Sequence, residues 1–328
     1  MRRSSAAAPW AALPARVALL ISALLAVAAC SSGSTARSHA PAAGSAAPTV
    51  SGPFGTTPSI SLPGGPAPTG LQTTVLSKGA GPVVTKGELL VADYVGELWN
   101  GGTVFDSSFK RHQAASFTIG TGQVIPGWDK GLVGQSAGSR VLLVIPPVEG
   151  YGPSGNPQGG IKGDDTLVFV VDVRASFAGT ASAKGLAAPA FAASLPKVGA
   201  GAGEPAVTIP NTAVPAALVA SDVLVGTGEA VAKGDLLVVQ YVGKTWRDGK
   251  TFDASWSRGA PVGFAIGTGQ VIPGWDTGLV GKTVGSRVLL VLPPAAGYGS
   301  AGNTQAGIKG DDTLVFVMDL LGSFPPAK

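Results

Sequence analysis

The sequence predicts an α+β fold that occurs twice along the chain. The decapeptide Gly-Thr-Gly-Gln-Val-Ile-Pro-Gly-Trp-Asp stands at 120–129 and again, unchanged, at 267–276. The same shift of 147 positions superposes 87–172 on 234–319 without an insertion. Each copy contains several β-branched and aromatic runs but one short helical segment, which is typical of an antiparallel sheet packed on a single helix. We therefore expect two tandem domains of this kind.

The first 29 residues have the pattern of a secretory signal peptide. Arg2, Arg3 and Arg16 precede an uncharged run over 17–29, which ends in Val-Ala-Ala before Cys30, the only cysteine of the chain. The run is shorter than the roughly 20 apolar residues that span a bilayer, and small residues before a cysteine are typical of lipoprotein cleavage sites. The segment resembles a bacterial lipoprotein signal, which implies lipid on Cys30 and an anchor on the extracytoplasmic side of the cell membrane. The alternative is an ordinary cleaved signal in which Cys30 has no role.

The charge balance gives no support to nucleic-acid binding as a function of the chain, and the cysteine content excludes a disulfide. Without the three arginines of the signal, 20 of the 23 Lys and Arg residues remain against 19 Asp and Glu. A balanced chain offers no basic face for a phosphate backbone, so nucleic-acid binding is not expected. With Cys30 lipidated, no thiol is left to form a disulfide, and stability must come from packing.

Two segments rich in Ala, Gly, Pro, Ser and Thr divide the chain. Residues 30–69 and 178–212 contain few large apolar side chains, so they are not expected to bury enough surface to offset the entropy of ordering. We expect the first to be a disordered tether behind the lipidated cysteine and the second to be a flexible linker. The folded domains are then 70–177 and 213–328, each of an ordinary size for one core.

Three strands and one helix are expected within the first copy. The runs at 89–95, 139–145 and 166–173 are rich in β-branched and aromatic residues and are bounded by Gly, Pro or Asp. A short helix opens at Pro126, where proline suits the first helical position, and carries Trp128. The runs contain one charged residue each, namely Asp93, Arg140 and Asp172. This pattern favours a sheet with one face on a core.

The repeated residues exclude most catalytic chemistries. His39 falls in the predicted tether, and His112 is replaced by Gly259 in the second copy, so no duplicated His-dependent triad or usual zinc site is expected. The decapeptide is not a dinucleotide fingerprint, because its sixth position is Ile125 instead of glycine. The repeated Asp-Asp pair after Lys-Gly is explained by turn chemistry. No cofactor or metal is therefore expected, and a glycosidase carboxylate pair, although formally open, has no surrounding signature.

The residues kept in both copies are mainly apolar and aromatic. They are joined by one Asp next to a Phe, one Arg, and a Tyr in a Pro- and Gly-rich loop, where a large ring more often serves a surface pocket than a core. For any single aromatic, a role in the core is the simpler interpretation. A reaction that needs only such a pocket is rotation about an X-Pro amide, whose barrier of roughly 20 kcal/mol comes from amide resonance. A site that removes water, holds the proline ring and favours the twisted amide lowers this barrier without a covalent step.

Each copy resembles an FKBP-type peptidyl-prolyl cis/trans isomerase domain, over 71–177 and 214–324. The resemblance rests on the motifs Tyr-Val-Gly, Phe-Asp-Ser/Ala-Ser, Phe-x-Ile-Gly-x-Gly-Gln-Val-Ile-Pro-Gly-Trp-Asp-x-Gly-Leu, Tyr-Gly-x-x-Gly-Asn and Asp-Thr-Leu-Val-Phe. It implies an antiparallel sheet curved around one short helix. It also implies isomerase activity on X-Pro bonds of exported or cell-envelope proteins, without a cofactor, and macrolides as inhibitors.

Carried over residue by residue, the resemblance assigns one proline pocket to each copy. In the first copy Trp128 is the floor, and the Ile125 N–H and the Tyr151 hydroxyl donate to substrate carbonyls. Asp106 is the pocket carboxylate, with Arg111 as its partner. The walls are Tyr94, Phe105, Val124, Ile125 and Phe169, with a loop contact from Ile161. The corresponding residues of the second copy are Tyr241, Phe252, Asp253, Arg258, Val271, Ile272, Trp275, Tyr298, Ile308 and Phe316.

The sequence departs from the family pattern at the rim of the pocket. A common wall aromatic is here Ala115 and Val262, and a histidine common in the Tyr-Gly loop is Asn156 and Asn303. These changes bear on substrate preference and macrolide affinity. Two other classes stay open: a proline-binding or chaperone module with little or no turnover, and a purely structural receptor domain. The retention of the Asp, both Tyr and the Trp in both copies argues against decay of either site.

Overall fold

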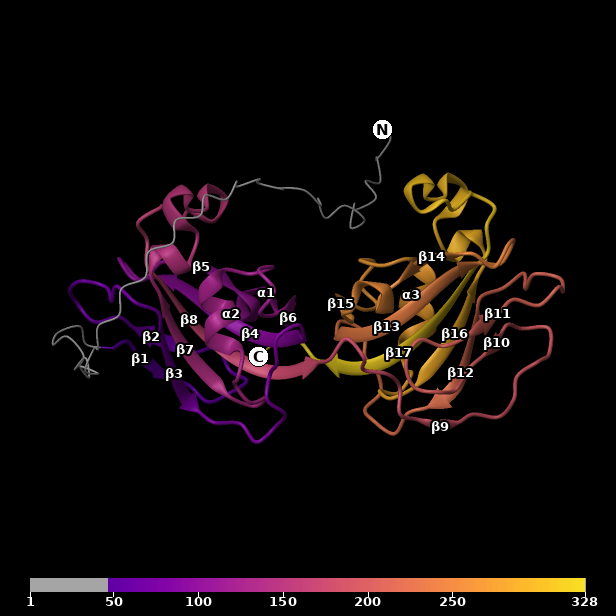
Figure 1. The fold of residues 1–328 in the computed structure, drawn as a ribbon, viewed down its shortest axis with the longest axis horizontal. Helices are drawn as coiled ribbons and strands as arrows, with labels where there is room; N and C mark the ends of the chain where they lie inside the picture. The colour runs from indigo at the N-terminus through magenta and orange to yellow at the C-terminus, as the bar shows by residue number, and fades with distance from the viewer. Residues whose placement is uncertain (1–46, 328) are drawn as a thin grey trace, which may run out of the picture. The chain divides into compact units, whose positions relative to one another are not determined.

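The computed structural model describes residues 47–327. Cys30, the predicted signal peptide and the first part of the predicted tether lie outside these residues. Each repeat forms one antiparallel sheet with a few short helices (Figure 1). No helix in the described range is long and apolar enough to cross a membrane.

The sheet of the first repeat has its strands in the order β3-β7-β8-β4-β5, and β6 pairs with the first residues of β4. The strands are β3 (Gln72–Ser77), β4 (Leu89–Leu98), β5 (Val104–Ser107), β6 (Ala115–Thr118), β7 (Arg140–Ile145) and β8 (Leu167–Phe177). The three predicted strands are present as β4, β7 and β8. The sequence does not reveal β3, β5 and β6, because β3 is exposed throughout and the other two have four residues each.

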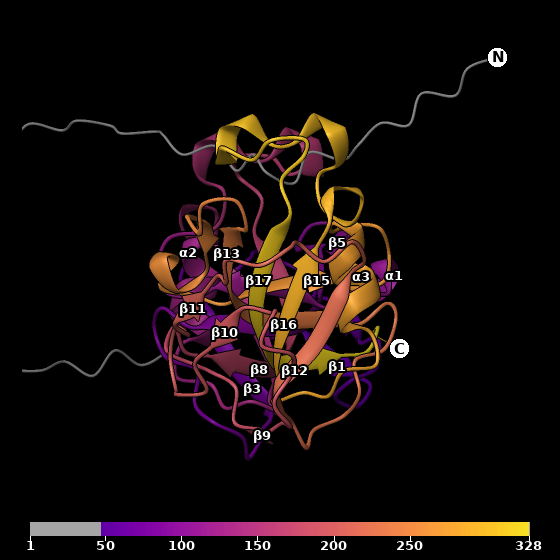
Figure 2. The ribbon, with the colours of Figure 1, turned by 90° about the vertical axis from the view of Figure 1, so that its right-hand side faces the viewer.

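The sheet of the second repeat has the order β9-β12-β16-β17-β13-β14, and β15 pairs with β13. Its strands are β9 (Leu186–Ala187), β12 (Val219–Val225), β13 (Leu236–Thr245), β14 (Thr251–Ala254), β15 (Val262–Ala265), β16 (Arg287–Leu292) and β17 (Leu314–Phe324). Figure 2 shows β12, β16 and β17 side by side, as their pairing requires. Strand β9 has no counterpart among the described residues of the first repeat, because the matching positions 39–40 lie outside 47–327.

The helices are short. They are α1 (Ser108–Arg111) and α2 (Pro126–Leu132) in the first repeat and α3 (Pro273–Leu279) in the second. The remaining helical turns are η1 (Pro147–Glu149), η2 (Gly152–Ser154), η3 (Pro157–Gly159), η4 (Trp256–Arg258), η5 (Pro294–Ala296), η6 (Gly299–Ala301) and η7 (Thr304–Ala306). The predicted helix at Pro126 is α2, whereas α1 departs from the expectation of a single helix. Its extra turn depends on a cap, because the Ser107 side chain accepts from the Lys110 N–H, and Ala254 at the matching position cannot do so.

Helix α2 lies close against β7 because glycine faces the strand. A Cβ on Gly127 would lie 2.6 Å from Ile145 Cγ2, and a Cβ on Gly131 would lie 2.6 Å from Leu143 Cδ2. Any larger residue at these positions would push the helix away from the sheet. The close approach buries Trp128, which is 3% exposed, in the apolar cluster between helix and sheet.

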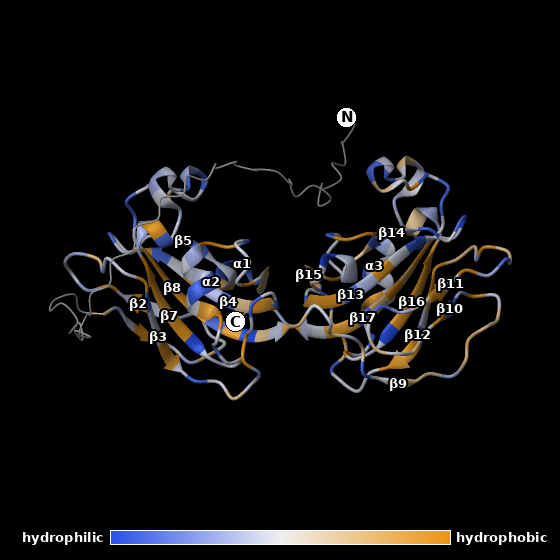
Figure 3. Ribbon diagram, in the orientation of Figure 1, coloured by the Kyte–Doolittle hydropathy of each residue, from blue (hydrophilic) through white to orange (hydrophobic). Residues whose placement is uncertain are grey.

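The opposite face of the first sheet is covered by a hairpin. It consists of β1 (Thr49–Ser51) and β2 (Ser59–Ser61), which pair in an antiparallel manner. Val50, Ile60 and Leu62 of this segment pack against a buried patch of the sheet and its flank, namely Trp99, Leu142, Val144, Val168 and Val170. Figure 3 shows hydrophobic residues along β7 and β8. The sheet therefore has two covered faces, and the expectation that residues up to 69 form a disordered tether is wrong for 47–69.

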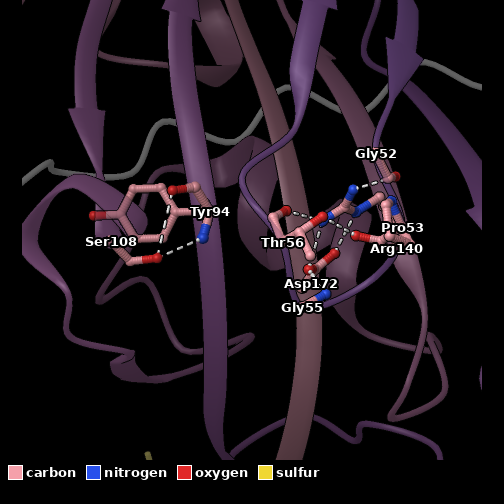
Figure 4. Close-up of polar contacts among 8 residues, drawn as sticks. All are labelled: Gly52, Pro53, Gly55, Thr56, Tyr94, Ser108, Arg140 and Asp172. Carbon is pink, nitrogen blue, oxygen red and sulfur yellow. Dashed lines mark hydrogen bonds and ion pairs between the residues drawn. The ribbon is translucent and has the colours of Figure 1, made fainter. Parts of the chain in front are cut away.

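A buried ion pair holds this hairpin on the sheet. Arg140 donates from Nε and Nη2 to the two carboxylate oxygens of Asp172 at 2.6 and 2.7 Å, and neither side chain is more than 3% exposed. The guanidinium also donates to the carbonyls of Gly52 and Thr56 at 2.6 and 2.7 Å, while Asp172 accepts the Gly55 N–H at 2.7 Å (Figure 4). A buried guanidinium needs acceptors for all its donors. The hairpin carbonyls supply the acceptors that the Asp172 carboxylate cannot.

The second repeat contains the same clamp. Arg287 pairs with Asp319 at 2.6 and 2.7 Å, and both side chains are fully buried. The guanidinium also donates to the carbonyls of Gly199, Gly201 and Gly203 at 2.7, 2.8 and 2.9 Å. These carbonyls belong to the loop between β10 (Lys197–Val198) and β11 (Val207–Thr208), which form the second hairpin.

The duplicated unit is therefore longer than the sequence pattern suggests. Gly52 and Ile60 of the first hairpin stand 147 positions before Gly199 and Val207 of the second. The Ala183 N–H already donates to Asp319 at 2.8 Å, and β9 pairs with β12. Most of the segment 178–212, predicted to be a flexible linker, thus folds onto the second sheet. Composition alone fails here because a few apolar side chains and one guanidinium are enough to order a chain of small residues.

We expect Arg140→Ala to destabilise the first repeat by about 3–5 kcal/mol, because Asp172 would remain buried without a counter-charge. Urea unfolding measures the loss, and limited proteolysis at 47–69 reports release of the hairpin. The matched control is Arg140→Met with Asp172→Leu, which removes both charges and should recover most of the stability. A loss of less than about 1 kcal/mol for the single variant, in the range of an exposed pair, would contradict this account.

Candidate active site

The indole of Trp128 is the centre of an aromatic cluster in the first repeat. Its ring centroid lies 5.2 Å from Tyr94, 5.2 Å from Phe117 and 5.3 Å from Phe169, with interplanar angles of 90°, 78° and 85°. Phe105 packs edge-on to Phe169 at 5.4 Å. Edge-to-face contacts at these distances are favourable beyond simple burial. The three neighbours therefore fix the plane of the indole.

A cavity of about 510 Å³ is lined by this cluster, which is an ordinary size for a small-ligand site. The lining residues are Tyr94, Phe105, Asp106, Phe117, Gln123, Val124, Ile125, Trp128, Tyr151, Asn156, Gly159, Ile161 and Phe169. The structure thus brings together every site residue predicted for the first repeat except Arg111, which contacts Asp106 and Tyr94 instead. Phe117, Gln123 and Gly159 line the cavity but were not predicted as site residues, and Asn156 was predicted only at its rim.

One carboxylate lies at the cavity and is held by two neighbours. Asp106 accepts a hydrogen bond from the Tyr94 hydroxyl and forms an ion pair with Arg111. Arg111 also donates to the Tyr94 hydroxyl at 2.9 Å, and its guanidinium lies 5.5 Å from the centre of the Tyr94 ring. Burial, together with the hydrogen bond to Asp106, raises the pKa of Tyr94 above the ordinary tyrosine value. The phenol therefore remains protonated and acts as a donor to Asp106.

The repeated decapeptide is closed by its own last residue. The Asp129 carboxylate accepts the Gly120 N–H at 2.6 Å and the Gly122 N–H at 2.7 Å. Both glycines have positive φ angles, of 78° and 77°, which other residues rarely adopt. The two bonds tie the loop that carries Val124 to the start of α2. This clasp explains why the glycines and the aspartate recur together, and the sequence did not reveal it.

A buried serine positions Tyr94. Ser108 Oγ accepts the Tyr94 N–H at 2.8 Å and is fully buried (Figure 4). The same hydroxyl lies 3.2 Å from a carboxylate oxygen of Asp93. In the second repeat Ser255 accepts the Tyr241 N–H at 2.7 Å. This is the physical role of the second serine in the Phe-Asp-Ser/Ala-Ser motif.

The second repeat has the same aromatic floor. The Trp275 ring centroid lies 5.3 Å from Tyr241, 5.0 Å from Phe264 and 5.1 Å from Phe316. Phe252 packs edge-on to Phe316 at 5.4 Å. The other apolar residues predicted for this site, Val271, Ile272, Tyr298 and Ile308, belong to the same apolar cluster or pack against it.

The polar group of the second repeat also matches the first. Tyr241 donates to Asp253, and Arg258 pairs with the same carboxylate. Arg258 Nη2 donates to the Tyr241 hydroxyl at 2.8 Å, and the guanidinium lies 5.4 Å from the ring centre. Burial and the contact with Asp253 raise the pKa of Tyr241, as for Tyr94. Both sites therefore hold the same Tyr-Asp-Arg arrangement.

Several donors at the two sites have no partner within the described residues. The Ile125 N–H, just before α2, meets no acceptor in the described part of the chain. Tyr151 is 39% exposed and lines the cavity. The indole N–H groups of Trp128 and Trp275 are buried and unpaired in 47–327. Buried donors are normally paired, so donors left open in and around an apolar cavity are typical of a site that a ligand completes.

The second aspartate of the repeated Asp-Asp pair has a structural role. The Lys162 N–H donates to Asp165 at 2.7 Å, and the Lys309 N–H donates to Asp312 at 2.8 Å, which confirms the predicted turns. Across 47–327, no group of three or more His, Cys, Asp or Glu side chains is placed to hold a metal ion.

A model of the FKBP-type peptidyl-prolyl cis-trans isomerases matches residues 81–174 and 227–321, which is more than half of the chain. The chain belongs to this family. The matched segments contain the aromatic floor and the Tyr-Asp-Arg group of each FKBP-type repeat. They do not include either hairpin.

Individual relatives match one or both FKBP-type repeats. "Peptidyl-prolyl cis-trans isomerase FKBP9" of Bos taurus is 33% identical over 241 residues, which cover 72% of this chain and 36% of the relative. "FK506-binding protein" of Streptomyces anulatus is 42% identical over 118 residues, which cover 36% of this chain and 95% of the relative. The crystal structure of AtFKBP13 is 37% identical, covers 34% of this chain and 96% of its own, and has a TM-score of 0.31. The chain thus spans only 36% of the length of the FKBP9 relative.

We expect Ser108→Ala to destabilise the first repeat by about 1–3 kcal/mol, because the buried Tyr94 N–H would lose its acceptor. Urea unfolding followed by tryptophan fluorescence measures the change. The control is Ser107→Ala, which removes only the cap of α1 and places there the residue found at Ala254 in the second repeat. An equal or smaller effect of Ser108→Ala would show that the serine does not position Tyr94.

Proposed function

We propose that this chain is a two-site peptidyl-prolyl cis-trans isomerase that acts on X-Pro bonds of polypeptides. The observation that carries the proposal is the cavity of about 510 Å³, which has an aromatic floor and Asp106 as the only charged residue among its lining side chains. Membership of the family supports the same activity. Because the floor, the walls and the carboxylate occur in both repeats, we propose turnover at both sites.

The geometry suits a reaction that is catalysed by binding alone. A prolyl ring placed on Trp128 would contact Tyr94 and Phe169, and its burial would remove water from the adjoining amide. The Ile125 N–H and the Tyr151 hydroxyl would donate to carbonyl oxygens of the bound segment. Twisting the amide removes its resonance, so a site that fits the twisted form better than either planar form accelerates rotation.

Asp106 would act through its neighbours. Its carboxylate holds the Tyr94 hydroxyl, and Arg111 balances its charge. The Tyr94 ring is part of the cavity wall and packs on Trp128, so the carboxylate fixes one wall of the pocket. A carboxylate beside an apolar cavity also contributes a fixed field at the site of the amide, where electrostatic effects are larger than in water.

We further propose that the chain is exported and anchored by lipid on Cys30, with proline-containing segments of exported or cell-envelope proteins as substrates. This rests on the sequence pattern of residues 1–30. Macrolides are proposed ligands of the same apolar cavity, because one relative is named as an FK506-binding protein and covers a single repeat.

We expect wild-type protein to accelerate cis-trans rotation in proline tetrapeptides, measured without a coupled protease. The double variant Asp106→Val with Asp253→Val should stay folded and keep part of its peptide affinity while losing most of the activity, because Tyr94 and Tyr241 would lose their acceptors. The control double variant, Asp164→Val with Asp311→Val, changes carboxylates of exposed turns and should leave activity unchanged.

The pocket floor is tested by Trp128→Ala with Trp275→Ala in the same assay. Both binding and turnover should fall, and because loss of a large buried aromatic typically costs about 3–5 kcal/mol, folding is checked by unfolding curves. Wild-type protein that binds proline peptides without accelerating them would replace the enzyme proposal with a proline-binding module.

We expect Cys30→Ser to leave either a soluble chain or an unprocessed one that keeps its signal, because the proposed lipid would have no attachment site. Membrane fractionation after expression in a cell that processes lipoproteins measures this, with incorporation of labelled palmitate as a second readout. Sedimentation of the substituted chain with membranes after signal cleavage would refute the proposed lipid anchor.

A further inference from the structure

The two pockets share their floors but differ at their rims. At two positions the second repeat has the larger side chain: Val262 for Ala115 and Ala306 for Gly159. Gly159 lines the first cavity, and Ala115 packs against the apolar cluster that contains the floor. Differences confined to the rim alter which side chains fit beside a bound proline, while the floor that holds the prolyl ring remains the same.

Gly159 leaves room that Ala306 fills. Gly159 lines the first cavity, and a Cβ built on it would lie 3.3 Å from Asn156 Nδ2, another lining atom. In the second repeat Ala306 packs against the apolar cluster that contains Trp275. Both residues end a 3-10 turn, at η3 and η7, so the backbone carries the methyl group to the matching place.

Val262 is the larger side chain at the other of these positions and packs against the apolar cluster that contains Trp275. It stands two residues before Phe264 on β15, so the two side chains point to the same face of the strand. Val262 and Phe264 both pack against the apolar cluster of the second repeat. The Phe264 ring is inclined by 36° to Trp275, whereas Phe117 is inclined by 78° to its indole. Phe264 therefore packs on Trp275 in a different orientation in the repeat that has Val262.

The rim tyrosines follow the same difference. Tyr151 is 39% exposed, but Tyr298 is half-buried and packs against the apolar cluster of its repeat. Burial raises the pKa of Tyr298, and hydrogen bonding with Asn303 offsets part of the rise. Ile272, whose N–H precedes α3, is 6% exposed, while its counterpart in the first repeat is only partly buried. Two residues of the second site, Tyr298 and Ile272, are thus more buried than their counterparts in the first.

We propose that the two pockets divide their substrates by the size of residue X in the X-Pro bond: the first accepts large side chains, and the second, narrowed by Val262 and Ala306, selects small ones. This rests on the proposed isomerase function. The prolyl ring occupies the floor, so the side chain of X must lie at the rim during rotation. A rim with three additional carbon atoms leaves less space for that side chain.

Separate observation of each pocket in one molecule tests the proposal. The indole N–H resonances of Trp128 and Trp275 report the two sites in the intact two-repeat chain, so neither pocket has to be inactivated. Tetrapeptides that differ only in X, with Ala or Leu before the proline, are titrated against both signals. We expect the ratio of Kd for Leu to Kd for Ala to be about tenfold higher at Trp275 than at Trp128, since a small steric difference in an apolar pocket is worth at least this factor.

Reciprocal variants identify the residues responsible. Val262→Ala with Ala306→Gly should bring the ratio at Trp275 down to the value at Trp128. Ala115→Val with Gly159→Ala should raise the ratio at Trp128, and Gly159 has no positive φ that would strain the alanine. The resonance pattern of the unaltered repeat serves as the folding control in each variant.

Equal ratios in the wild-type chain, or ratios that the reciprocal variants leave unchanged, would overturn the division of substrates while leaving the isomerase proposal intact. Absence of any response at either indole, with the protein folded, would instead remove the proline-pocket function and this inference with it. Isomerisation rates for the same two peptides distinguish the two proposals. If both peptides are turned over and the two sites show the same preference, the isomerase function is supported and the division of substrates is not.

Discussion

The edge-to-face packing of the Trp128 indole is the interaction on which the rest of the first repeat depends. Its three ring partners come from three strands: Tyr94 from β4, Phe117 from β6 and Phe169 from β8. A slip of one residue in any strand would turn its ring to the other face of the sheet. Pocket geometry therefore depends on strand register. On the far face, Arg140 and Asp172 stand directly opposite each other on β7 and β8, so the buried ion pair opposes such a slip.

The contacts of the repeated carboxylates show why the site is suited to binding a twisted amide and not to acid-base catalysis. Asp129 closes the decapeptide loop, Asp165 caps a turn, and Asp172 pairs with a guanidinium. Of the repeated aspartates, only Asp106 lines the cavity. Its carboxylate is already bound by Tyr94 and Arg111. A group held in this way shapes the wall and its field, which is sufficient for a reaction whose barrier is amide resonance.

The sequence predicts the parts of this fold that are locally encoded. The strands β4, β7 and β8 were predictable because each is a continuous run of β-branched and aromatic residues, and most of the cavity lining followed from family motifs. The hairpins were not, because their order depends on contacts distant in sequence: Gly52 and Thr56 meet Arg140 more than 80 positions away. The only hint in the sequence was the charged residues within the apolar strands, such as Arg140 and Asp172, which need partners when buried. Ser108 and Gly159 were missed for a related reason, since their roles appear only when the partner atoms are known.

Duplication separates two kinds of constraint on the same pocket. The floor and its ring partners serve the core and the site together, and these residues are the same in the two repeats. The clamps, Arg140 with Asp172 and Arg287 with Asp319, are also kept, although they lie outside the cavity lining. Rim positions such as Gly159 and Ala306 are less constrained by the core, so they can change without loss of the fold. Divergence at the rim beside an unchanged floor is therefore the pattern expected when two copies keep one chemistry and differ in what they bind.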